Sequence, residues 1–210
     1  MGKCVISISR EFGSGGRMIG KQLAARLGIP CYDRTIIQKT AEKSGLSPEF
    51  IANAERSTRS RFHFHVPMIG SATTVYTPQE PSVRQKAFIA QAQAIRELAA
   101  QGSCVIVGRC SDYILEEDPN CLRVFIHADM EERLRRCAQE YQLPEKDLRR
   151  RILETDRSRA NYYGRYTGYV WGDMRRYDLT IDSGRIGVEG AVELIEQLVR
   201  IRCPERFAET

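Results

Sequence analysis

The feature that most constrains this chain is a glycine-dense turn between a run of apolar residues and a helical pattern. The apolar run Cys4–Ile8 leads into Ser-Arg-Glu-Phe-Gly-Ser-Gly-Gly-Arg, and residues 19, 23 and 27 then recur as Ile, Leu and Leu. Glycines permit backbone angles that turn successive N–H groups inward, toward the positive end of the helix dipole. This layout predicts a phosphate loop formed by Gly13, Ser14, Gly15, Gly16, Arg17 and Met18.

Arg17 stands where a basic side chain would reach the outer phosphates of a ligand in such a loop. The alternative is an ordinary strand-to-helix turn that happens to be rich in glycine. Three glycines flanked by Arg10 and Arg17 exceed what tightness alone requires, so we expect phosphate binding.

Five apolar runs separated by helical patterns predict an α/β fold. The runs are continuous rather than alternating, which indicates strands buried on both faces of a parallel sheet with helices on each side. At 210 residues the chain suits a single three-layer domain spanning residues 1–210. The predicted strands are Cys4–Ile8, Pro30–Tyr32, Cys104–Val107, Leu122–His127 and Leu179–Asp182.

Residues typical of helix starts support this alternation of strands and helices. Ser82 with Gln85 forms a capping-box pattern, and Asp129 with Glu132 begins another helix. Pro144 predicts the first turn of the helix that follows. Two segments lie outside the alternation: we expect residues 56–81 to form a flap or insertion beside the ligand, and residues 156–173 to form a lid.

The composition indicates which kinds of ligand and surroundings to expect for this protein. The net charge of +5 is modest, but arginines cluster at 133–136, 149–151 and 157–165, which favours a polyanionic ligand. Seven cysteines without a Cys-x-x-Cys pair indicate reduced core thiols. Because no apolar run approaches the roughly 18 residues that span a bilayer and no leader is visible, we expect a cytoplasmic protein with no membrane partner. The oligomeric state stays open, a homo-oligomer included.

Polar residues that follow the strands mark the other half of the predicted site, because ligands bind at the carboxyl ends of an open parallel sheet. Asp33 and Arg34 follow the second strand, and Arg109 follows the third, where a buried guanidinium needs an anionic partner. The alternative for Asp33 is the N-cap of a helix. Arg157 and Arg159, two residues apart, cannot both face one side of a straight helix, so we expect one of them to act from the lid.

The chain resembles the cytidylate kinase-like family of P-loop proteins. The segments that carry the resemblance are, in this order, the loop Ser9–Arg17, the Tyr-Asp pair after the second strand, Gly-Arg after the third and the segment Asp156–Tyr163. The resemblance covers nearly the whole chain. It implies a nucleoside monophosphate kinase fold, ATP with Mg²⁺ as donor, and a small phosphorylated acceptor such as CMP. It assigns the donor phosphates to the loop, the acceptor to Asp33, Arg34 and Arg109, and catalysis to Arg17, Arg157 and Arg159.

The chain departs from the usual pattern in three ways, one of which is that residues 56–81 do not match a cytidine-recognising segment. Arg17-Met18 replaces the Lys-Ser/Thr of a standard P-loop, which removes the hydroxyl that binds Mg²⁺, and Cys110 stands where cytidylate kinases carry Asp. The acceptor base and the metal ligand therefore stay open. A nucleotide-binding protein with little or no kinase activity is the first alternative. The second is a basic module for RNA, which we do not expect because aromatic residues are scarce among the basic runs.

Overall fold

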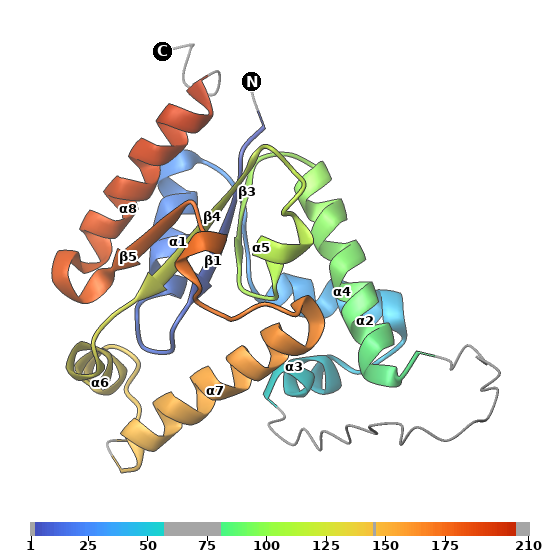
Figure 1. Cartoon of the computed structure of the whole chain (residues 1–210), viewed down its shortest axis with the longest axis horizontal. Helices are drawn as coiled ribbons and strands as arrows, with labels where there is room; N and C mark the ends of the chain where they lie inside the picture. Colours follow the sequence, from blue (N-terminus) through green and yellow to red (C-terminus); the bar gives the residue numbers. More distant parts are fainter. Residues whose placement is uncertain (1–2, 57–80, 145, 205–210) are drawn as a thin grey trace, which may run out of the picture.

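A parallel β-sheet forms the centre of the computed structural model, which describes residues 3–56, 81–144 and 146–204 (Figure 1). Its strands are β1 Val5–Arg10, β2 Cys31–Tyr32, β3 Cys104–Val107, β4 Cys121–His127 and β5 Leu179–Asp182. They lie in the order β2-β3-β1-β4-β5, and each neighbouring pair is parallel. The first strand of the chain thus occupies the middle of the sheet, and the five predicted strands are confirmed.

Helices cover both faces of this sheet, as the continuous apolar runs predicted. On one face α1 and α8 pack against β1 and its neighbours, and on the other α4, α5 and the end of α7 do so (Figure 1). The helices are α1 Gly16–Leu27, α2 Arg34–Ser44, α3 Pro48–Arg56, α4 Val83–Ala100, α5 Ser111–Ile114, α6 Met130–Gln139, α7 Leu148–Thr167 and α8 Ser183–Arg202, with a 3₁₀ turn at Met174–Arg176.

The two faces of β1 contribute to two separate cores. Ile6 and Ile8 pack with α1 and α8, whereas Val5 packs with α4 and α5. Toward the carboxyl end of the strand, Ser7 and Ser9 replace apolar residues on the second face, and both are buried. The apolar core therefore gives way to polar groups as β1 approaches the loop.

The predicted helix signals are confirmed at two of three places. Ser82 and Gln85 form a reciprocal capping box at the start of α4, and the Asp129 carboxylate accepts from the amide of Glu132 at 2.9 Å. The prediction for Pro144 is wrong, because α7 begins only at Leu148. The Leu143 amide donates to the Cys137 carbonyl at 3.1 Å, so Pro144 belongs to the connection that leaves α6.

The two segments predicted outside the regular elements have different outcomes. Residues 57–80 of the predicted flap lie outside the described residues. Most of the predicted lid is helical, since α7 continues to Thr167 and ends with Gly168 in a left-handed conformation, φ 75°. Its C-terminal half packs on α4, where the rings of Phe88 and Tyr166 stack at 4.2 Å. A lid movement, which stays a prediction, would break this contact.

The two ends of the sheet differ in what surrounds them. At one end β1 begins and α8 finishes, and at the other α6, α7 and α3 lie beyond the carboxyl ends of the strands (Figure 1). Among the helices of the described residues, none is both long and apolar enough to cross a bilayer. The seven cysteines are all free, as predicted.

Gly20 sets how closely α1 approaches the sheet. A Cβ at this position would lie 2.9 Å from a methyl carbon of Val107 and 3.4 Å from Ile8. We expect Gly20→Val to lower the free energy of unfolding by about 1–3 kcal/mol through overpacking, measured by urea denaturation. The matched control Lys21→Val, at an exposed position of the same helix, should cost less than about 1 kcal/mol; equal costs would contradict this packing.

Candidate functional site

The loop between β1 and α1 has the conformation that its glycines predicted. Gly13 and Gly15 adopt left-handed angles, with φ 84° and φ 79°, which side chains rarely tolerate. Gly15 is the N-cap of α1, and the amides of Gly16 and Arg17 lie in the first turn, where a helix supplies no acceptor. These N–H groups and the helix dipole together form a place for an anion.

Side chains from three helices bind the carbonyl groups of this loop. Arg159 Nη1 of α7 donates to Arg10 O at 2.9 Å, and Arg133 Nε of α6 donates to Phe12 O at 2.8 Å. Two more donors complete the set: Arg136 Nη1 binds Gly13 O at 3.1 Å and Ser183 Oγ binds Ser14 O at 2.5 Å. With these carbonyl oxygens engaged, the amides of Gly15, Gly16 and Arg17 at the start of α1 are the groups that a ligand would meet.

A carboxylate on α7 completes the support. Asp156 accepts from the Phe12 amide at 2.7 Å and forms an ion pair with Arg133, whose guanidinium also lies 3.2 Å from the carboxylate of Glu11. Burial raises the pKa of Glu11, and the positive charge of Arg133 opposes that shift. Asp156 thereby links the loop, α6 and α7 through one carboxylate.

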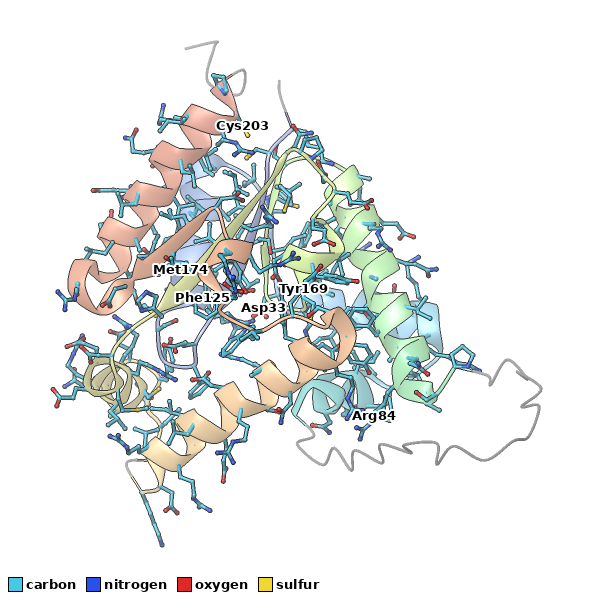
Figure 2. The ribbon with its side chains drawn as sticks, viewed as in Figure 1. Asp33, Arg84, Phe125, Tyr169, Met174 and Cys203 are labelled. Atoms are coloured by element: carbon cyan, nitrogen blue, oxygen red, sulfur yellow. The ribbon has the colours of Figure 1, made fainter. Side chains whose placement is uncertain are left out.

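Arg17 and Asp33, which were predicted on the donor and the acceptor sides, are partners here. Arg17 Nε lies 2.6 Å from Asp33 Oδ2, and the Arg17 side chain is 45% exposed. Asp33 occupies the N-cap position of α2, but its side chain makes no capping hydrogen bond. Figure 2 shows Asp33 near the middle of the view, closer to α7 than to Cys203. A phosphate at the loop would compete with Asp33 for Arg17.

Arg109 lies at the carboxyl end of β3 and is buried, with 9% exposure. Gly108, Arg109 and Cys110 all have left-handed φ angles, 75°, 63° and 53°. For residues with side chains this conformation is costly. The turn is fixed by Gln91, which donates to Arg109 O at 3.1 Å, and by the Arg10 guanidinium, which packs where Gly108 has no Cβ. The side chain of Arg34 lies outside the described part of the chain.

The two arginines of the predicted lid separate as their spacing required. Arg157 is exposed, whereas Arg159 is half-buried and lies 3.6 Å from Asp156 in addition to its bond with Arg10 O. The structure therefore brings Arg159 to the loop and leaves Arg157 on the surface.

Sequence reasoning missed a buried carboxyl group at the start of α5. Asp112 accepts from Tyr163 Oη at 2.7 Å and from Ser9 Oγ at 3.3 Å, beneath the carboxyl end of β1. Burial raises the pKa of Asp112, against the hydrogen bonds from Tyr163 and Ser9. The run Gly-Arg-Cys-Ser-Asp places this Asp two residues after the position at which cytidylate kinases carry one, and that offset was the available signal.

Oxygen ligands for a divalent cation are scarce at the loop. Over residues 3–56, 81–144 and 146–204, no group of three or more His, Cys, Asp and Glu side chains is placed to hold a metal ion. The Ser14 hydroxyl is buried and donates to Glu11 O at 3.0 Å, and Met18 offers only a thioether, which Mg²⁺ does not favour. These residues do not fit a Mg²⁺ site built by the protein.

Comparisons with known proteins identify the family to which the chain is similar. A family model described as the cytidylate kinase-like family matches residues 5–185. A cytidylate kinase of Methanopyrus kandleri is 29% identical over 191 residues, 86% of this chain and 85% of the relative.

Solved structures add a likeness in fold. An uncharacterized protein from Eubacterium ventriosum has a TM-score of 0.70 at 27% identity, over 94% of this chain and 98% of that chain. Shikimate kinase from Acinetobacter baumannii has a TM-score of 0.53 at 14% identity, over 96% and 95%. The second likeness concerns the fold alone.

The buried position of Asp112 gives its stability contribution a definite pH dependence. The folded protein retains this proton at a pH where the unfolded chain, with a carboxyl pKa of about 4, has lost it. The contribution of this group to the free energy of unfolding therefore falls as the pH rises through that window. Asp112→Asn cannot ionise and still accepts from Tyr163. We expect its free energy of unfolding, relative to that of the unmodified protein, to become larger from pH 4 to pH 7 in urea titrations, which means a relative gain in stability. A constant difference would contradict this assignment.

Proposed function

The chain belongs to the cytidylate kinase-like family, and from this premise we propose that it is an ATP-dependent phosphotransferase. Its acceptor would be a nucleoside monophosphate such as CMP, or a similar small phosphorylated molecule. The observation that carries the proposal is the loop at the head of α1, whose carbonyl groups are held by Arg133, Arg136, Arg159 and Ser183. Phosphoryl transfer needs positioning and charge neutralisation more than covalent chemistry by the protein, and this arrangement offers both.

In this proposal each group has a defined task. The amides of Gly13, Gly15 and Gly16 bind the donor phosphates, and Arg17 leaves Asp33 to neutralise the outer phosphate. Asp33, released by that exchange, faces the acceptor together with Arg34 and Arg109. Arg159, held near the loop by Asp156, approaches the transferring group, and the exposed Arg157 would reach it only after a movement of α7.

The residues at the loop that could ligate a cation determine how Mg²⁺ would bind. Because Met18 and the buried Ser14 are poor ligands for Mg²⁺, we expect any Mg²⁺ to arrive on the nucleotide phosphates with its own water. The same residues favour a second candidate function, which is nucleotide binding with little or no turnover.

Turnover separates the two functions. Purified protein incubated with ATP and Mg²⁺ against a panel of nucleoside monophosphates and nucleosides should release ADP above the background without acceptor. Arg17→Met should lower kcat/KM by at least about a hundredfold, because it removes a charged group that binds the transferring phosphate. The measurement is ADP release in a coupled assay.

Lys21→Met is the matched control, since Lys21 is exposed one helical turn farther along α1. This variant should retain the activity of the unmodified protein. Tight ATP binding without acceptor-dependent ADP for any member of the panel would contradict the kinase and support the nucleotide-binding protein. Normal ATP affinity in Arg17→Met would contradict the assignment of Arg17 in both.

A further inference from the structure

Arg136 is a buried cation. In the proposed function it only donates a hydrogen bond to the loop, and its positive charge has no role. The residue is 3% exposed and extends from α6 to the side of the loop that carries the carbonyl groups, where it donates to Gly13 O. A Cβ at Gly15 would lie 3.4 Å from Arg136 Nε and 3.5 Å from Cζ, so the guanidinium lies against the loop. Glycine is favoured at position 15 by its φ of 79°, and the guanidinium lies in van der Waals contact with this position.

The charge of Arg136 is only weakly compensated. Its nearest carboxylate is Glu140, at 3.6 Å from Nε, which is beyond hydrogen-bond distance, and Nε is buried without a hydrogen-bond partner among the described residues. Its neighbour Arg133 differs, because Glu11 and Asp156 both form ion pairs with that guanidinium. A buried cation that a partly exposed carboxylate neutralises only in part is costly, and an anion brought near it recovers part of that cost.

The loop itself lacks the lysine that supplies positive charge in a standard P-loop. Arg17, which stands in its place, is 45% exposed and bound to Asp33. We propose that Arg136 supplies the missing charge from behind the loop, as a positioning residue that holds Gly13 and raises the affinity for polyphosphate. This inference rests on the proposed function, since it takes the ligand of the loop to be a triphosphate.

Binding of ATP and of inorganic tripolyphosphate, measured by isothermal titration calorimetry, tests this inference in the full chain. Arg136→Met should weaken both ligands by about tenfold or more, the scale of a hydrogen-bonded charge. Arg135→Met is the matched control, because Arg135 lies on the same helix, is 46% exposed and pairs with Glu132 at 2.7 Å. It should bind both ligands as the unmodified protein does.

Two further measurements separate charge from structure. The loss in Arg136→Met should grow from phosphate to pyrophosphate to tripolyphosphate, whereas a distorted loop would weaken all three by the same factor. Glu140→Gln removes the partial counter-charge and leaves Arg136 in place. It should bind tripolyphosphate about two- to fivefold more tightly, the scale of a partly exposed ion pair. This gain cannot arise from misfolding.

The outcomes distinguish the inference from the function on which it rests. If the unmodified protein binds tripolyphosphate while Arg136→Met and Glu140→Gln bind it within twofold of that affinity, the inference fails and the proposed function stands. If the unmodified protein binds neither ATP nor tripolyphosphate, both fail. Weaker binding in Arg136→Met with tighter binding in Glu140→Gln is the expected result.

Discussion

The contact on which the site depends is the ion pair between Arg133 of α6 and Asp156 of α7, formed around the backbone of Phe12. Arg133 donates to the Phe12 carbonyl and Asp156 accepts from its amide, so both polar groups of one peptide residue are bound by the same pair of side chains. Breaking a largely buried pair of this kind leaves the Arg133 guanidinium with less compensation for its charge, which is typically costly. The geometry of the loop is therefore fixed by two helices far from it in sequence.

This arrangement explains how a loop rich in glycine can be ordered. Glycines permit the left-handed angles at positions 13 and 15, but they also give the unfolded loop many conformations. The bonds from Arg136 and Ser183 to consecutive carbonyl groups restrict those conformations. A loop held in this way loses little further entropy when it binds an anion, and such preorganisation is a recognised source of affinity.

Much of the fold could be predicted from the sequence, because the strands are continuous apolar runs and the sheet buries them on both faces. The conformation of the loop between β1 and α1 could be predicted because glycine at three of four positions has few structural alternatives. The supporting groups could not: Arg133, Arg136 and Asp156 lie in charged helical stretches in which nothing distinguishes an inward from an outward side chain. The buried position of Asp112 could not be predicted for a related reason, since it depends on Tyr163 of α7, which is distant in sequence. Pro144 was misplaced because Leu143 packs back on α6 before α7 begins.

The structure of the complex with a non-hydrolysable ATP analogue tests the account most directly. We expect the triphosphate to lie within hydrogen-bond distance of the amides of Gly15, Gly16 and Arg17. We also expect the carbonyl groups of Phe12, Gly13 and Ser14 to remain bound to Arg133, Arg136 and Ser183. A nucleotide bound elsewhere, or a loop that reorganises and releases these carbonyl groups when the triphosphate binds, would contradict the account.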